Sequence, residues 1–96
     1  MQIDITRTGA KVTVTPMGRL DSNTAGEFDT AMTEAIAVGP ENVTVDAAGV
    51  DFISSKGLRI LIKASRTGTP VTVINANGAV REVIRLSGLT KLFGLE

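Results

Sequence analysis

The sequence predicts an α/β fold with the element order β-β-α-β-α-β-α-α, in which helices cover mainly one face of a four-stranded mixed sheet. Three observations predict it. Short runs alternate apolar and polar residues, which is typical of half-buried strands. Longer segments carry apolar residues at the spacing of an amphipathic helix. Strand and helix segments then alternate along the chain, and such units cross over right-handed, so the strands that they join should be parallel.

The amino-acid composition excludes several classes of function. The chain has 96 residues, and we expect one domain spanning 1–96. It contains no cysteine and no histidine, so thiolate metal sites and Ser-His-Asp or Cys-His catalysis are excluded. We therefore expect no metal, no cofactor and no enzymatic activity. Ten basic residues balance ten acidic ones and aromatic residues are 3%, which argues against a nucleic-acid partner. No apolar run reaches membrane-spanning length and no signal peptide opens the chain, so we expect no membrane insertion and a cytoplasmic location.

The first two strands are predicted to form a hairpin. Residues 2–6 alternate apolar and polar, and residues 11–15 do the same up to Pro16. Thr8 and Gly9 lie between them as a turn signal. The two strands should pair antiparallel at a sheet edge, and residues 18–21 should form a connection.

The first helix is predicted from a start signal and an apolar stripe. Thr24 and Glu27 have the spacing of a capping box. Residues at helical spacing then form the core face, and the helix should end near residues 39–40. The predicted stripe is Phe28, Ala31, Met32, Ala35 and Ile36.

The third strand is predicted over residues 43–46, with Asp46 near its carboxyl end. Ligands and partners usually bind open α/β sheets at the edge formed by the carboxyl ends of the strands, so Asp46 is a candidate binding residue. The simpler interpretation is that Asp46 is an ordinary carboxylate in a turn. Residues 47–50 should lead to Phe52 and Ile53, which we expect to fill the core.

The second helix is predicted from about residue 56 to 66. Its core face is expected to include Leu58, Ile60, Leu61, Ile62, Ala64 and Ser65. Arg59, Lys63 and Arg66 should form the solvated face; an anionic partner could bind them, but a charged stripe opposite an apolar one normally means solvent exposure.

Residues 71–74 are predicted as the fourth strand, followed by a turn over residues 75–78. Gly88 should end the third helix, and residues 89–93 should form a final helical turn. Apolar residues should form the buried side of the third helix and of the last turn. They are Val80, Val83, Ile84 and Leu86 in the helix, and Leu92 and Phe93 in the turn.

The candidate site is the pair Ser54 and Ser55, directly before the second helix. Either hydroxyl could accept from a backbone N–H of the first turn as an N-cap. The same helix end favours an anion, because unpaired N–H groups and the helix dipole both point at it. Gly57 would let another backbone or a phosphate approach closely. A structural cap and a phosphate site both fit these residues.

Three segments together resemble the STAS domain family, which is named for sulfate transporters and anti-sigma factor antagonists. Residues 18–25 resemble its G-x-L-D-x-x-T-A segment. Residues 43–58 resemble its central strand, loop and switch helix, and residues 79–93 resemble its C-terminal signature. The three occur in the family's order over nearly the whole chain.

The resemblance implies an anti-sigma factor antagonist. Such a protein binds, when unphosphorylated, an anti-sigma factor that is also a serine kinase, and it is released by serine phosphorylation and reset by a serine phosphatase. Aligning on Gly57 and Leu58 puts the phosphorylated position on Ser55, with Ser54 as the competing acceptor. The implied partner-binding residues are Asp21, Asp46, Ser54, Ser55, Lys56 and Gly57.

The chain departs from the family pattern beside that serine. Many antagonists carry Asp before it and Ser or Thr after it, where this chain has Ser54 and Lys56. Two alternatives therefore stand beside the switch: a constitutive scaffold or transporter-associated subunit in which Ser55 is a cap, and a small-ligand or nucleotide sensor that uses the same helix end.

Overall fold

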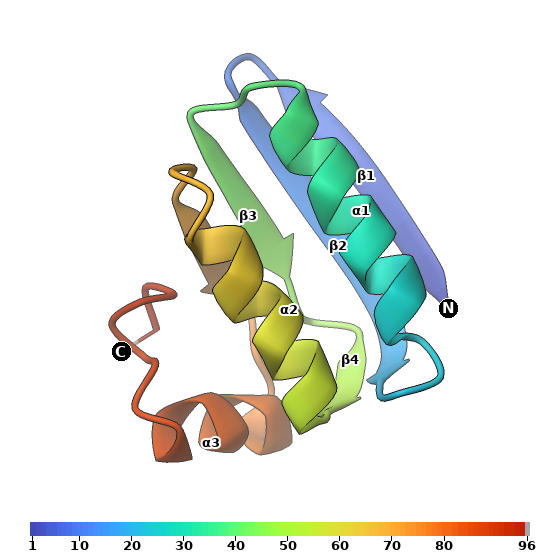
Figure 1. Ribbon diagram of the computed structural model, residues 1–96. Helices are drawn as coiled ribbons and strands as arrows, with labels where there is room; N and C mark the ends of the chain where they lie inside the picture. The colour runs from blue at the N-terminus through green and yellow to red at the C-terminus, as the bar shows by residue number, and fades with distance from the viewer. Residues whose placement is uncertain (96) are drawn as a thin grey trace.

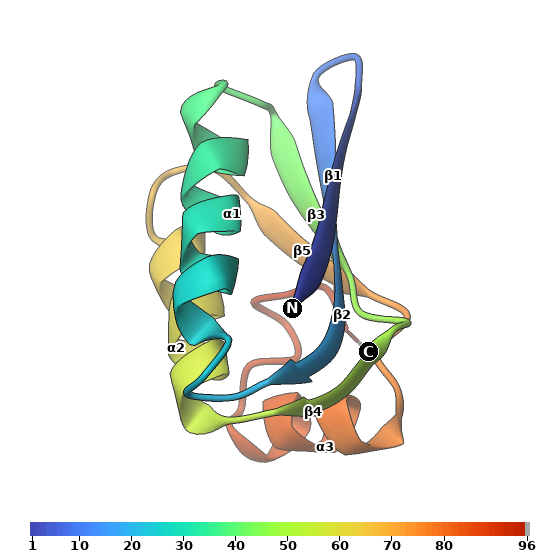
Figure 2. The same cartoon turned by 90° about the vertical axis from the view of Figure 1, so that its right-hand side faces the viewer.

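The computed structural model describes residues 1–95, which fold into a mixed five-stranded sheet with helices packed against it (Figures 1 and 2). The predicted α/β class is confirmed, with five strands instead of four. The elements are β1 (Gln2–Thr8), β2 (Lys11–Leu20), α1 (Ala25–Ala37), β3 (Asn42–Asp46), β4 (Val50–Ile53), α2 (Ser55–Ser65), β5 (Val71–Ile74) and α3 (Gly78–Leu86).

The main part of the sheet has the order β1-β2-β3-β5. β1 pairs antiparallel with β2 from Gln2 opposite Met17 to Thr8 opposite Lys11, which confirms the edge hairpin. β3 lies parallel to both β2 and β5. The two strand–helix–strand crossovers therefore give parallel pairs, as predicted.

The fifth strand arises because β2 continues beyond Pro16 to Leu20, so the connection predicted at residues 18–21 is wrong. Gly18 has a φ of 102°, and the register shifts between Gly18 and Arg19. Glycine reaches this φ without a Cβ clash. β2 pairs with β3 as far as Val14, and from Gly18 to Leu20 it pairs parallel with β4.

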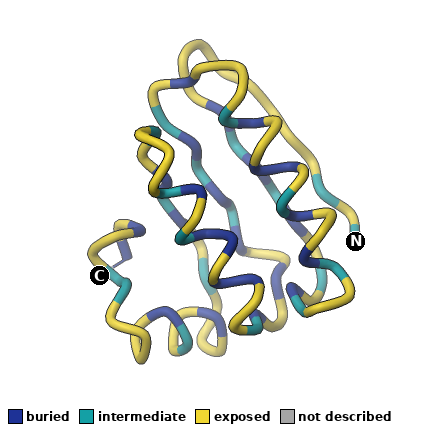
Figure 3. The backbone as a smooth tube through the Cα atoms, viewed as in Figure 1, coloured by how far each residue is buried: buried dark blue, intermediate teal, exposed yellow. Residues whose placement is uncertain are grey.

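The helices lie mainly on one side of the sheet. Figure 2 shows α1 and α2 side by side over one face, and α3 beside β4 at the lower end of the molecule. In Figure 3 buried and exposed residues alternate along these helices, and their buried apolar residues belong to the core that includes the strands. The opposite face carries the half-buried threonines of the central strands: Thr13, Thr15, Thr44 and Thr72. This matches the predicted arrangement. Within residues 1–95, no helix has both the length and the apolar character that crossing a membrane requires.

Packing corrects several predictions. Ile53 and Phe93 are buried as expected, but Phe52 is 36% exposed and stacks against the guanidinium of Arg19, whose Cζ lies 4.3 Å from the ring centroid. Phe52 projects from β4 toward solvent, where the arginine covers it in place of the core. Leu86 and Leu92 are 71% and 48% exposed, because the helix and turn that carry them each bury only one side.

The predicted final helical turn forms as a single turn and not as a regular helix: the N–H of Phe93 donates to the carbonyl of Leu89, four residues earlier, at 3.3 Å. Gly88 ends α3 with a φ of 73°, as predicted, and Gly94 has a φ of 71°. The five residues between these left-handed glycines are too few for a stable helix, so they form turns. The carbonyl of Phe93 accepts from the N–H of Val73 at 2.9 Å, and Leu95 completes the core.

Candidate functional site

The start of α2 is held against the end of β2. The N–H of Ser54 donates to the carbonyl of Leu20 at 2.8 Å. A Cβ built on Gly57 would lie 3.1 Å from that same carbonyl oxygen and 3.1 Å from Cγ1 of Ile53. Such contacts are tighter than a side chain normally makes, so a glycine is needed for the helix backbone to approach β2 this closely.

The two serines differ in role. Ser54 is the N-cap: its backbone is extended, and its Oγ accepts from the N–H of Gly57 at 3.2 Å. Ser55 is the first helical residue, and its side chain is exposed and makes no hydrogen bond within residues 1–95. The sequence allowed either hydroxyl to cap the helix, and the structure assigns the cap to Ser54.

The helix end has hydrogen-bonding capacity left for an anion. The first amides of a helix have no carbonyl partner within the helix. Ser54 Oγ accepts from Gly57, while the N–H groups of Ser55 and Lys56 have no acceptor in the described part of the chain. The ammonium of Lys56 is exposed and likewise forms no ion pair there. The exposed hydroxyl of Ser55 therefore lies at a helix start that offers two amides, the helix dipole and the cation of the next residue, Lys56.

Asp21 lies beside this site, one residue after the carbonyl that binds Ser54. Its Oδ1 accepts from the N–H groups of Asn23 at 2.9 Å and Thr24 at 3.3 Å. The bond from Asn23 is the main reason that the pKa of Asp21 lies below its ordinary value, and Arg19, with Nε 3.5 Å from Oδ2, adds to the effect. The carboxylate therefore shapes the turn between β2 and α1.

The predicted capping box at the start of α1 is wrong. The hydroxyl of Thr24 donates to the carbonyl of Arg19 at 2.6 Å and accepts from the N–H of Asp21 at 3.0 Å, so it makes no bond to the first turn of the helix. Glu27 instead binds the amino group of Met1 at 3.1 Å. The tight turn after β2 competes successfully for the threonine hydroxyl.

Asp46 lies away from the serines. Its Oδ1 accepts from the N–H of Ala48 at 3.1 Å and from the side-chain amide of Asn75 at 3.2 Å, which ties the end of β3 to the end of β5. Asp46 precedes β4 and Ser54 follows it, and Figure 2 shows the two ends of β4 on opposite sides of the molecule. The structure thus brings Asp21 to the start of α2 and separates Asp46 from it.

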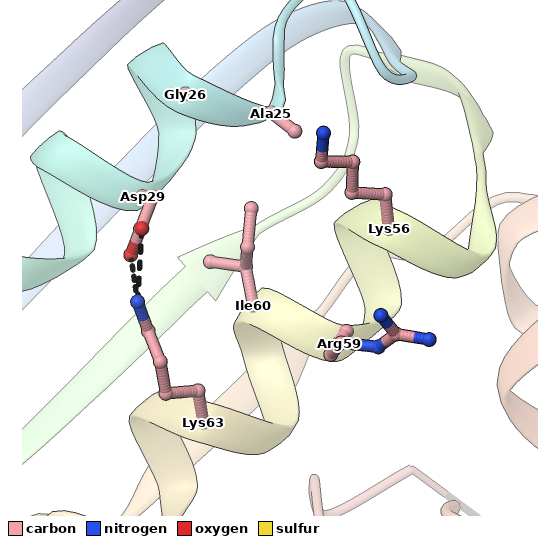
Figure 4. Close-up of a pocket in the computed structure, with 7 residues that line it drawn as sticks. All are labelled: Ala25, Gly26, Asp29, Lys56, Arg59, Ile60 and Lys63. Carbon is pink, nitrogen blue, oxygen red and sulfur yellow. Dashed lines mark hydrogen bonds and ion pairs between the residues drawn. The ribbon is translucent and has the colours of Figure 1, made fainter.

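A second feature was missed by the sequence interpretation. A groove of about 260 Å³ runs between α1 and α2 and begins beside the candidate site (Figure 4). Lys63 reaches across it, with its Nζ 2.7 and 2.9 Å from the two carboxylate oxygens of Asp29. The spacing of Arg59 and Lys63 was visible in the sequence, but the neighbouring face of α1 was not. We call this feature the α1–α2 groove; it is lined by Ala25, Gly26 and Asp29 of α1 and by Lys56, Arg59, Ile60 and Lys63 of α2.

Within residues 1–95, no three acidic, cysteine or histidine side chains gather closely enough to hold a metal ion.

The family model described as "Mlab, STAS domain" matches residues 3–95. The chain belongs to the STAS domain family. The resemblance drawn from the three sequence segments is thereby confirmed.

Similar STAS proteins include anti-sigma factor antagonists. The anti-sigma-F factor antagonist RsfB of Mycobacterium tuberculosis is 35% identical over 81 residues, which cover 81% of this chain and 66% of that relative's length. A crystal structure of an anti-sigma factor antagonist from Mycobacterium paratuberculosis has a TM-score of 0.90 at 28% identity and covers 98% of this chain and 83% of that one.

The fold is also that of the Bacillus antagonist SpoIIAA. Its unphosphorylated form has a TM-score of 0.81 and its phosphorylated form 0.73, both at 18% identity and over 95% of this chain. The matches cover 84% and 87% of the two SpoIIAA chains. At this identity the likeness concerns the fold alone.

Proposed function

We propose that this STAS domain is an anti-sigma factor antagonist that is switched by phosphorylation of Ser55. In the unphosphorylated state it binds an anti-sigma factor that is also a serine kinase; phosphate on Ser55 breaks the complex, and a serine phosphatase restores it. The observation that carries the proposal is the exposed hydroxyl of Ser55 at the start of α2, with the helix already capped by Ser54.

The helix end can accept the modification without rearrangement. A phosphate adds roughly −1.5 to −2 charge and three acceptor oxygens. At a helix N-terminus that charge is favourable, and the N–H groups of Ser55 and Lys56 have no competing acceptor in the described residues. The cation of Lys56 is an additional partner. The fold should therefore stay nearly unchanged while the surface that meets the partner becomes strongly anionic.

Ser54 is the poorer acceptor of phosphate. Its Oγ is occupied by the N–H of Gly57, and its backbone N–H is bound to Leu20, so the residue is half-buried between the helix and β2. Phosphate on this oxygen would disturb the cap and would have to fit against the strand. The neighbouring Ser55 has neither obstacle.

The proposed partner surface contains the residues around this hydroxyl: Asp21, Ser54, Ser55, Lys56 and Gly57. A dianion in such an interface meets partner groups that were arranged for a neutral hydroxyl. A change of about 1.4 kcal/mol alters the affinity tenfold, so a few unfavourable contacts suffice for release. The role is binding rather than catalysis, in keeping with the antagonist names of the similar proteins.

The test of phosphorylation is incubation of the protein with ATP and an anti-sigma factor that has serine kinase activity, followed by mass spectrometry of the modified peptide. We expect one phosphate on Ser55, none in Ser55→Ala and continued uptake in Ser54→Ala, the matched control. Absence of phosphate from the unaltered protein, or undiminished uptake in Ser55→Ala, would contradict the switch.

A second measurement separates the switch from a purely structural serine. Ser55→Asp should weaken binding of the partner kinase about tenfold or more, because it adds a charge to the interface. Its melting temperature should stay close to that of the unaltered protein, because an acidic residue in the first turn of a helix is favourable. A collapse of the fold, or partner binding that is unchanged, would favour the constitutive scaffold.

A further inference from the structure

The α1–α2 groove combines an apolar floor with charged walls. Ala25 of α1 and Ile60 of α2 are both buried and form its base (Figure 4). Lys56 and Lys63 extend from α2 over this base, while Arg59 lines the groove but points to the other side of the helix. An apolar base with polar edges is the composition of a protein-docking surface rather than of an ordinary solvated helix face.

The groove is positive although the chain as a whole is neutral. Three cations line it against the single carboxylate of Asp29, which leaves an excess of two positive charges. Lys63 is paired with Asp29, while Lys56 and Arg59 form no ion pair anywhere in residues 1–95. The N-terminal end of the α2 dipole adds to the same field. Such a local excess attracts an anionic partner.

The placement of the cations favours an extended anion. Residues 56 and 63 are seven positions apart, which is about 10 Å along the axis of a helix. In Figure 4 Lys56 points toward Ala25, Lys63 points toward Asp29, and Arg59 points to the other side of α2. The three head groups do not converge, so a single phosphate could meet only one of them closely. A peptide with carboxylates at intervals and aliphatic side chains between them could contact Lys56 and Lys63 in turn, cover the apolar base, and meet Arg59 at the edge of the groove.

We propose that the α1–α2 groove docks an acidic segment of a protein partner. The inference rests on the proposed function in taking the anti-sigma factor as that partner. It also gives the switch an electrostatic basis, because Ser55 immediately precedes Lys56 at the mouth of the groove. A phosphate of roughly −1.5 to −2 charge there would cancel most of the positive excess and repel the acidic segment.

The test uses a short synthetic peptide of alternating Glu and Leu residues as the probe, titrated into the ¹⁵N-labelled full chain and followed by NMR. We expect the amide shifts to map to the first two turns of α1 and to α2, and binding to weaken as salt is added. The double variant Lys56→Glu/Arg59→Glu should bind about tenfold more weakly. The control variant Lys11→Glu makes the same kind of charge change on the distant hairpin. It should bind the peptide with the same affinity as the unaltered chain.

Several outcomes would overturn the proposal. One is that a peptide with Gln in place of Glu binds as tightly as the Glu peptide, and another is that Lys11→Glu loses as much affinity as the double variant. A third is that the amide shifts map away from the groove. The last is that inorganic phosphate, ATP or anionic lipid vesicles bind the same residues more tightly than the peptide does. The peptide titration requires no phosphorylation. Peptide binding without any uptake of phosphate on Ser55 would therefore contradict the switch alone, and phosphorylation without peptide binding would contradict the groove alone.

Discussion

The helices α2 and α3 begin in the same way, yet only α2 carries a hydroxyl on its first helical residue. In each, a polar N-cap accepts from the amide three residues later: Ser54 from Gly57 at 3.2 Å, and Asn77 from Val80 at 3.0 Å. The next residue differs, because α2 begins with the exposed hydroxyl of Ser55 and α3 with Gly78.

The two helix starts are also anchored differently. The cap of α3 holds the helix through its side chain, since Asn77 Nδ2 donates to the carbonyl of Val50 in β4. The start of α2 is held by backbone contacts, through the N–H of Ser54 and the close approach of Gly57 to Leu20. An anchor made of backbone leaves the first side chain of α2 available to solvent. This is the arrangement that the proposed phosphorylation of Ser55 requires.

The largest effect should follow loss of the side-chain anchor of α3. Asn77→Ala removes the cap and leaves the carbonyl of buried Val50 without its donor. A lost cap costs about 1 kcal/mol and an unpaired buried acceptor about 1–3 kcal/mol, so we expect a loss of about 2–4 kcal/mol. Urea unfolding monitored by circular dichroism measures it. A loss no larger than that of Ser54→Ala would contradict the distinction between the two anchors.

A pair of glycine substitutions tests the backbone anchor of α2. In Gly57→Ala the new methyl group would meet Leu20 and Ile53 at 3.1–3.2 Å. Overpacking typically costs about 1–3 kcal/mol, and the helix preference of alanine offsets up to about 1 kcal/mol of it, so we expect a net loss of about 1–2 kcal/mol.

Gly78→Ala is the matched control, because a Cβ there has no neighbour within 4 Å. We expect it to stabilise the protein by up to about 1 kcal/mol through the helix preference of alanine. Thermal unfolding of the two variants side by side measures the difference in sign. Stabilisation by Gly57→Ala would mean that the start of α2 is not pressed against β2.

The smallest effects should separate the two neighbouring serines. Ser54→Ala removes the acceptor of the Gly57 N–H and should cost about 1 kcal/mol. Ser55→Ala removes an exposed hydroxyl without a partner in residues 1–95, and we expect a change within about 0.5 kcal/mol. Chemical denaturation of both variants under one set of conditions gives the comparison. Equal losses would show that both hydroxyls support the helix.

Much of the fold could be predicted from short-range patterns. The alternation in residues 11–15 and 43–46 gave two parallel neighbours, and the stripe that begins at Phe28 gave a helix with its core face correctly assigned. The strand at Val50–Ile53 was missed, because it is short and pairs only with an extension of β2 that requires the bulge at Gly18. The pairing of this strand therefore depends on the backbone conformation at Gly18, which is far from it in the sequence.

The candidate site was predictable in type but not in detail. The two serines before an apolar-periodic run indicated a helix start, yet nothing local distinguished the cap from the exposed hydroxyl. Thr24 and Glu27 satisfied the capping-box spacing equally well, and there the hydroxyl bonds to the turn after β2 instead. The α1–α2 groove requires two helices to lie side by side, as the ion pair between Asp29 and Lys63 shows.

By itself the sequence determined the α/β class, the order of most elements, and the position of a hydroxyl-bearing helix start, because periodicity and capping depend on residues within a few positions of one another. Only the tertiary structure decided that Ser54 caps α2, that Ser55 faces solvent, and that Lys56 and Lys63 stand over a groove. Those outcomes depend on contacts with β2 and α1, which folding brings together from distant parts of the chain.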